Sequence, residues 1–181
     1  MIGSGNNAKH EGVPCDWLLK ALQEKGLDIV QLQQQLPGYL DNSDITDIVL
    51  PLEVYNDTIE WAAQALENEN LGIELARNVD PLQFGTIGYL VANASSVADA
   101  LELITHYYRI FSHYFDADYT IEGDTCRYHY TPAAIFDSQT RQDIDFSLGM
   151  LVASFKRFTP KGWFPEVSSF TYSTPKDISE L

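Results

Sequence analysis

The chain has 181 residues, of which 45% are hydrophobic and 20% charged, a composition typical of a folded globular protein rather than a disordered one. It carries 11 Lys and Arg against 26 Asp and Glu, so the net charge is −15, which argues against nucleic-acid binding by this chain alone. No run approaches the ~20 consecutive apolar residues of a membrane-spanning helix.

The chain contains two cysteines, Cys15 and Cys126, which provide neither a disulfide framework nor a metal-binding cluster. His106 and His113 share one predicted helix but are separated by ~10.5 Å of helical rise, too far to bind one metal ion. No secretory signal is recognisable. We therefore expect a soluble, reduced, cytoplasmic protein without metal or cofactor, with Cys15 exposed near the start of the chain.

Residues 1–12 are rich in Gly and Asn and indicate a disordered terminus or an expression remnant. Helical spacing of apolar residues then predicts helices over 14–25, over 28–36 with Asp28 as N-cap, and over 51–70. A short helical turn is expected at 72–76. The small apolar stretch 84–94 fits a short helix, and a strand is the alternative.

A longer amphipathic helix is predicted over 97–115, capped by Ser95 and Ser96. Residues 118–131 alternate apolar and polar side chains around Gly123-Asp124, which predicts a hairpin with a type II′ turn. That turn sets the register, and opposite residues are then Glu122 and Thr125, Ile121 and Cys126, Thr120 and Arg127, Tyr119 and Tyr128, Asp118 and His129. One face of the hairpin is therefore apolar and tyrosine-rich.

A further helix is predicted over 138–158, and it is apolar around almost its whole circumference in the middle. Val167–Tyr172 alternates imperfectly and is expected to form another strand. The predicted fold class is α+β, with several helices packed on a small antiparallel sheet. Residues 13–181 are expected to form a single domain.

The order and spacing of several short motifs resemble the N-terminal effector-sensing, arabinose-binding-like domain of AraC/XylS-family transcriptional regulators. The matching positions are Gly85, Gly88, Tyr89, Ser95, Ala100, Leu101, Tyr108, Arg109 and Ser112, and Asp99 stands where the family usually has Glu. The run Gly72–Ala76 is similar to a preceding element of that family, and Asp124–Tyr130 lies where the family has a strand. The resemblance covers roughly residues 28–175.

The resemblance implies a bacterial transcription regulator whose sensor domain binds a small-molecule effector of unknown identity. The family's regulators carry a helix-turn-helix domain that contacts DNA, and no residues here match it. The sensor also usually extends past the position of Leu181. We therefore expect a sensor domain truncated at its C-terminus, which contacts DNA only through a domain absent from this chain and contacts no membrane.

Tyrosines are concentrated in the 97–115 helix and the hairpin, and a buried tyrosine hydroxyl needs a hydrogen-bond partner. This favours an amphipathic ligand cavity between that helix, the hairpin and the 139–157 helix. The candidate ligand-binding residues are Tyr89, Tyr107, Tyr108, Phe111, Tyr128, Tyr130, Leu148 and Val152. No catalytic motif is present, so no catalytic residue is assigned.

Three alternatives stay open. The chain could be a ligand-free dimerisation or interaction module, and a homodimer is compatible with either reading. A helix bearing His before an aromatic hairpin is also similar to haem-based gas-sensor domains, but Tyr128–Pro132 lacks the arginine of their Tyr-x-Ser-x-Arg motif. The chain could also be an enzyme, which would need an acid/base pair that converges in a pocket. The carboxylates of Asp137, Asp143 and Asp145 could form such a pair only if the fold brought two of them together.

Overall fold

The computed structural model describes residues 12–42, 44–80, 82, 86–111, 115–132, 141–156, 159–173 and 175–176. The chain divides into two compact units, Met1–Leu71 and Gly72–Leu181, and each is described by itself. In these ranges the chain has seven α-helices and two antiparallel two-stranded sheets, so the predicted α+β class is confirmed. No described helix is both long enough and apolar enough to cross a membrane. Of the terminus predicted as disordered, residues 1–11 lie outside the described ranges, and Gly12 is half-buried beside Val49 and Leu50.

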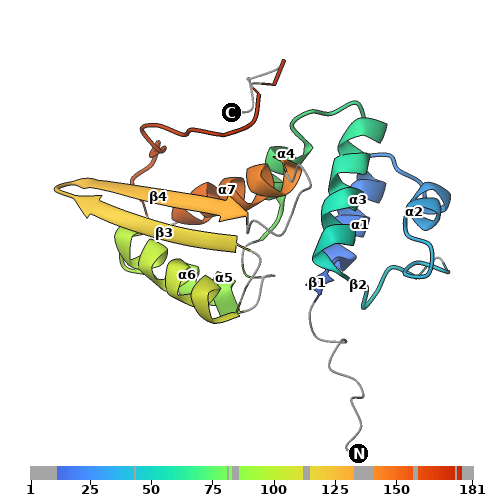
Figure 1. Ribbon diagram of the computed structural model, residues 1–181, viewed down its shortest axis with the longest axis horizontal. Coiled ribbons are helices and arrows are strands. Elements are labelled where there is room, and N and C mark those ends of the chain that lie inside the picture. The colour runs from blue at the N-terminus through green and yellow to red at the C-terminus, as the bar shows by residue number, and fades with distance from the viewer. Residues whose placement is uncertain are drawn as a thin grey trace, which may run out of the picture. The chain divides into compact units, whose positions relative to one another are not determined.

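The first unit joins three helices to a minimal sheet (Figure 1). Strand β1 (Val13–Pro14) pairs antiparallel with β2 (Val49–Leu50), and the helices are α1 (Asp16–Glu24), α2 (Ile29–Gln35) and α3 (Leu52–Ala65). Its core consists of leucines from every helix together with Tyr55 and Ile59. All three predicted helices are therefore present.

Local signals set the helix boundaries in the first unit. The Asp28 carboxylate accepts from the backbone N–H of Gln31 at 2.8 Å, and the Gln31 side chain accepts in return from the Asp28 N–H. This capping box confirms the predicted start of α2. Helix α3 ends earlier than predicted, at Ala65 rather than near Asn70, because Glu67 adopts a left-handed φ of 51° that ends the helix.

The expectation that Cys15 is exposed is wrong. Cys15 follows β1, and its backbone N–H donates to the carbonyl of Ile48 at 2.8 Å, which extends the β1–β2 pairing by one residue. The side chain is fully buried, and its thiol donates to the carbonyl oxygen of Val13 at 3.0 Å. The pairing of the chain start with a segment more than thirty residues later is what buries the thiol.

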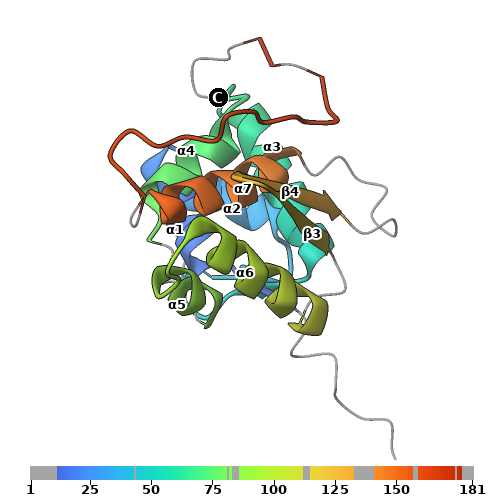
Figure 2. The same cartoon turned by 90° about the vertical axis from the view of Figure 1, so that its left-hand side faces the viewer.

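The second unit places four helices around one hairpin (Figures 1 and 2). Its helices and strands are α4 (Leu71–Asn78), α5 (Thr86–Ala92), α6 (Val97–Phe111), β3 (Phe115–Glu122), β4 (Thr125–Pro132) and α7 (Arg141–Phe155). The helical alternative for 84–94 is thus the correct one. Ser96 caps α6 by accepting from the N–H of Asp99, as predicted.

The predicted hairpin register is confirmed at every predicted pair, from Glu122 opposite Thr125 to Asp118 opposite His129. Gly123 has φ 62° and Asp124 keeps a negative φ, as a type II′ turn requires. The prediction that the preceding helix continues to Phe115 is wrong, because Phe115 pairs with Pro132 as the first residue of β3. Strand pairing outside the predicted span therefore lengthens the hairpin at its open end.

The strand predicted over Val167–Tyr172 does not form. The rings of Phe170 and Tyr172, two positions apart in this segment, contact each other, with centroids 5.0 Å apart. A strand needs a neighbour to pair with its backbone, and no described segment lies in ladder register with these residues.

The core of the second unit draws on α5, α6 and the end of α7. Its buried members are Val91, Ala94, Ala100, Leu101, Ile104 and Phe155. Partly buried side chains from the hairpin and α7, among them Tyr119, Tyr128 and Leu151, pack against it. The apolar face of the hairpin is therefore a wall of the core, whereas Ile121 near its tip is 56% exposed.

Helices α4 and α7 pack closely because small residues face each other. A Cβ added at Gly149 would lie 2.8 Å from the Cβ of Ala76, and one added at Gly72 would collide with the carbonyl oxygen of Gln142. Any larger residue at either glycine would push the two helices apart.

Candidate functional site

The tyrosine-bearing face of β4 meets α7. Tyr128 and Tyr130 lie on the same face of the strand, with ring centroids 6.5 Å apart and nearly parallel. The Tyr130 hydroxyl lies 3.4 Å from Oγ of Ser147, at the limit of a hydrogen bond. Both rings are half-buried. The hairpin therefore presents an amphipathic wall, with apolar rings and polar hydroxyls, to the helix that covers it.

The middle of α7 is apolar but only half-buried. The half-buried residues are consecutive: Ser147, Leu148, Gly149, Met150, Leu151, Val152 and Ala153. The ends of the same helix are buried instead, at Asp145 and Phe146 on one side and at Ser154 and Phe155 on the other. Burial normally increases with apolar character. Along α7 the polar N-terminal residues are covered and the apolar middle is left partly open.

Of the predicted residues, Tyr128 and Tyr130 lie on β4, and Leu148 and Val152 lie in the half-buried middle of α7. Tyr107 lies half-buried on α6. Tyr89 does not join this set as a buried side chain, because it is 61% exposed on α5. The side chains of Tyr108 and Phe111 lie outside the described part of the structure.

Thr105 on α6 was not predicted as a site residue, and its side chain is buried, at 2% exposure. No hydrogen bond from the described part of the chain reaches its Oγ. A buried hydroxyl without a partner costs about 1–3 kcal/mol. Thr105 follows Leu101 by four positions, so helical spacing places it on the apolar face of α6, but the absence of a described partner for its hydroxyl is seen only in the packing.

A second unpredicted cluster lies at the N-terminal end of α7. The Tyr172 hydroxyl donates to Oδ1 of Asp145, the Nε of Arg141 lies 3.4 Å from Oδ2 of the same carboxylate, and the Arg141 guanidinium carbon lies 5.2 Å from the Tyr172 ring centroid. Burial raises the pKa of Asp145 above its usual range, against the lowering effects of the Tyr172 hydrogen bond and Arg141. Burial, with the Asp145 carboxylate beside it, also raises the pKa of Tyr172.

The spacing of Arg141 and Asp145, one helical turn apart, is the usual signal of an ion pair on a helix surface. The sequence does not indicate that the Asp145 carboxylate is buried or that Tyr172 reaches it. Of the carboxylates weighed as an acid/base set, Asp143 and Asp145 are buried at the start of α7, and Asp137 lies outside the described residues. Within the described ranges, no three His, Cys, Asp or Glu side chains form a group suited to a metal ion.

Two of the histidines named in the sequence, His106 and His129, are exposed, and His113 lies outside the described residues. His106 is exposed on α6. His129 is exposed on β4, opposite Asp118, on the face of the hairpin that faces away from Tyr128 and Tyr130. The hairpin alternation that places the tyrosines inward places this imidazole outward.

Comparison with known protein families identifies residues 38–181 as matching the arabinose-binding domain found at the N-terminus of AraC transcription regulators. No curated protein sequence matches the chain. The matched residues include α6, the β3–β4 hairpin and α7. They therefore include the tyrosine wall, by which we mean the face of β4 that carries Tyr128 and Tyr130. The family is one of regulatory, ligand-sensing domains. The chain belongs to the arabinose-binding domain family of AraC transcription regulators.

Proposed function

We propose that this chain is the effector-sensing domain of a cytoplasmic, bacterial regulator of the AraC/XylS type, and that it has no catalytic activity. A small molecule binds it and shifts the population of an arrangement that controls a DNA-binding domain elsewhere in the parent protein. The observation that carries this proposal is the half-buried apolar middle of α7 beside the tyrosines of β4.

The proposed lining consists of Tyr107, Tyr128, Tyr130, Leu148 and Val152, with Tyr108 and Phe111 retained from the sequence. Ligand sites are commonly apolar with a few polar groups that fix orientation. Here the apolar part is the middle of α7, and the polar groups are the Tyr130 hydroxyl and the buried Thr105 hydroxyl. This chemistry suits an amphipathic small molecule with at least one hydrogen-bonding group.

The first experiment is thermal unfolding of the chain with a panel of amino acids, fatty acids, sugars, aromatic acids and haem. A ligand at 100 times its Kd adds about 2.7 kcal/mol to the free energy of unfolding, and this raises Tm by several degrees. A reproducible shift with one chemical class supports the proposal. A flat panel combined with a Tm that rises with protein concentration supports the dimerisation module instead.

A matched pair of variants locates the site once a ligand is found. Val152→Ala removes apolar contact from the middle of α7, and we expect about fivefold weaker binding, since this corresponds to ~1 kcal/mol of lost burial. Val30→Ala makes the same chemical change at a side chain that is 54% exposed in the first unit and should leave Kd unchanged. Equal Kd values for both variants and the unmodified chain would exclude this face of α7.

The charge of −15 leads to a further expectation. The chain alone should not bind duplex DNA at physiological salt, because non-specific DNA affinity depends on neutralising phosphates with Lys and Arg. Fluorescence anisotropy with labelled duplex measures this directly. Nanomolar binding would contradict the assignment of DNA contact to another domain.

A further inference from the structure

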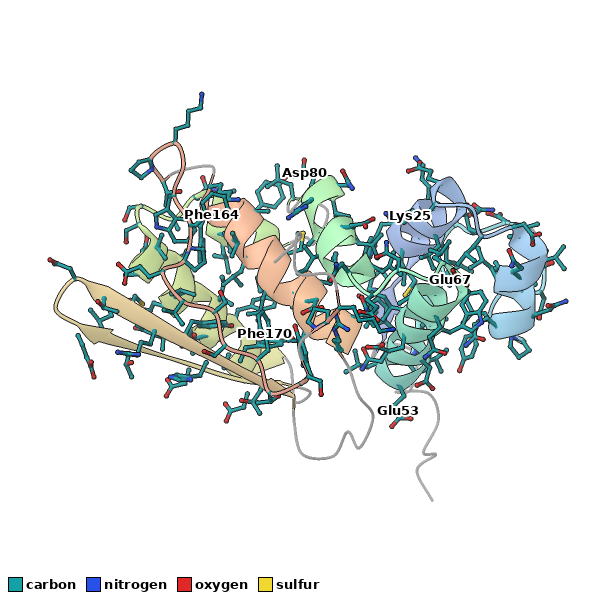
Figure 3. The ribbon with its side chains drawn as sticks, turned by 90° about the horizontal axis from the view of Figure 1, so that it is seen from above. Lys25, Glu53, Glu67, Asp80, Phe164 and Phe170 are labelled. Atoms are coloured by element: carbon teal, nitrogen blue, oxygen red, sulfur yellow. The ribbon has the colours of Figure 1, made fainter. Side chains whose placement is uncertain are left out.

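The segment that follows α7, residues 159–173, turns back and runs alongside that helix; we call it the return segment (Figures 1 and 2). Near the C-terminal end of α7, the Trp163 ring meets the Phe155 ring edge-on, with centroids 6.0 Å apart. At the other end of α7, Tyr172 donates its hydroxyl hydrogen to Asp145. Figure 3 shows Phe164 near the first of these contacts and Phe170 farther toward the second. The return segment is therefore fastened to α7 at two separate points.

The first fastening is mostly apolar and aromatic. Beside the Phe155–Trp163 contact, the Lys156 ammonium lies 3.7 Å from the centroid of the Phe164 ring. Trp163 packs against the core of the second unit, whereas Phe164 is 64% exposed. Because Trp163 shares the core, this end of the return segment is held by the same packing that folds the unit.

The second fastening includes the Tyr172 side chain, and Pro175, three positions farther along the chain, is buried as well. Asp145 is 1% exposed, and its carboxylate has Arg141 on one oxygen and the Tyr172 hydroxyl on the other. The Arg141 guanidinium also lies over the Tyr172 ring, so the ring and the hydroxyl each contribute a contact. We call Arg141, Asp145 and Tyr172 the latch. Of these three, only Tyr172 comes from the return segment.

The chain between the two fastenings is longer than the distance it spans. Phe155 and Asp145 are ten positions apart on one helix, which is ~15 Å. Trp163 and Tyr172 are nine positions apart in non-helical chain, which reaches ~30 Å when extended. Residues 164–169 are all exposed, and Val167 is 80% exposed. The return segment is thus longer along its middle than the distance between its two fastenings requires.

From these contacts we propose that the return segment is a releasable strap on α7, with the latch as its catch, and that the docked strap restricts access to the apolar middle of that helix. Breaking the latch frees the end at Tyr172 while the Trp163 end stays packed in the core. The strap and the latch do not depend on the proposed effector, so a failed ligand panel leaves this inference standing.

The test is ¹⁵N relaxation on the full chain, comparing the unmodified protein with Tyr172→Phe and Tyr172→Ala. The Phe variant keeps the ring over Arg141 and loses the hydroxyl, whereas the Ala variant loses both. We expect order parameters of residues 165–173 to be highest in the unmodified protein, lower in the Phe variant, and below about 0.6 in the Ala variant. Values in α6 should not change. Tyr39→Phe removes a hydroxyl from a ring that is 42% exposed in the first unit, and serves as the matched control.

A fluorescent apolar dye, anilinonaphthalene sulfonate, tests access to α7 in the same samples. Its fluorescence should rise in the order unmodified protein, Phe variant, Ala variant. Order parameters that are already below about 0.6 in the unmodified protein would show that no strap is docked. Unchanged order parameters in both variants would show that Tyr172 does not hold the return segment. Loss of amide dispersion throughout the second unit would show that Tyr172 is a core residue rather than part of a latch. Released variants with unchanged dye fluorescence would overturn the restriction of access.

Discussion

The backbone N–H of Gly72 donates a 2.7 Å hydrogen bond to the side-chain oxygen of Gln142, joining α4 to α7 across 70 positions of sequence. Gly72 lies in the first turn of α4, where backbone N–H groups have no partner within the helix. Gln142 is 2% exposed, so its amide oxygen is available to this donor and not to bulk water. The pair sets how closely the two helices approach.

Gly72→Ala should destabilise the second unit substantially. The added Cβ would collide with the carbonyl oxygen of Gln142, which belongs to a helix backbone and cannot rotate away. We expect a loss of about 2–4 kcal/mol, in the range of overpacking combined with a broken buried hydrogen bond. Chemical denaturation with an unchanged m-value measures it.

Gln142→Leu separates the two contributions, because it removes only the acceptor and leaves the Gly72 N–H buried. The expected loss is about 1–3 kcal/mol. Gln64→Leu makes the same substitution at an exposed position of α3 and should change the stability by less than ~0.5 kcal/mol. If the two leucine variants are equally stable, the Gly72–Gln142 bond contributes nothing measurable.

Asp16→Asn tests how the first unit holds its sheet. The Asp16 carboxylate accepts from the backbone N–H groups of Asp47 at 2.9 Å and Ile48 at 2.7 Å. Asp47 has a left-handed φ of 55°, which is uncommon for a residue other than glycine. We expect a loss of about 1–3 kcal/mol, since an amide offers one acceptor oxygen in place of two charged ones. Asp57→Asn, on the exposed face of α3, is the control.

Cys15 should be unreactive in the folded protein. Burial raises the pKa of its thiol from 9.0 to about 12, so the thiolate fraction near pH 8 falls by roughly 10³ relative to a free thiol. Alkylation by iodoacetamide should therefore modify Cys126, which is half-buried, before Cys15. Mass spectrometry of tryptic peptides gives both rates. The alkylation rates of the two cysteines should be equal in denaturant, which serves as the control. Comparable alkylation rates in native buffer as well would contradict the burial of Cys15.

The same thiol makes stability depend on pH in the alkaline range. Between pH 9 and about 12 the unfolded chain loses the Cys15 proton while the folded chain keeps it. The folded state then binds more protons, so stability falls as pH rises through this window. Cys15→Ala should flatten that fall, whereas Cys126→Ala should flatten it less, because its thiol is less buried.

Asp145 of the latch should make the free energy of unfolding depend on pH in the acidic range. Burial raises the pKa of Asp145 above 3.8. A carboxyl whose pKa is higher in the folded than in the unfolded state contributes stability that is full below the unfolded pKa and is lost as pH rises through the folded pKa. Asp145→Asn should therefore reduce the loss of stability between about pH 4 and neutral pH. Urea denaturation at several pH values measures it; an unchanged pH slope would show that Asp145 titrates normally.

Local chemistry accounts for most of the predicted secondary structure. The Asp28 capping box, the Ser96 cap and the Gly123-Asp124 turn act over a few residues, so their signals are visible in the sequence. The hairpin register followed from the turn alone, because a one-residue slip would reverse every side chain. The resemblance that identified the family rests on the same kind of short-range spacing.

The errors fall where a distant segment decides the outcome. Cys15 is buried because its strand pairs with residues 49 and 50, and Val167–Tyr172 is no strand because no described neighbour pairs with it. Within the candidate site, the shared face of Tyr128 and Tyr130 was predictable from hairpin alternation, but the exposure of Tyr89 and the lack of a described partner for the buried Thr105 hydroxyl were not.

The sequence by itself thus determined the helices of both units except for some of their ends, the hairpin register and the family, because caps, turns and periodicity are contacts between near neighbours. Only the tertiary structure decided that Gln142 satisfies Gly72, that Tyr172 reaches Asp145, and that the apolar middle of α7 stays half-covered. These contacts join residues up to 70 positions apart. Helical periodicity predicts which side chains share a face, but it does not predict which distant segment packs against that face.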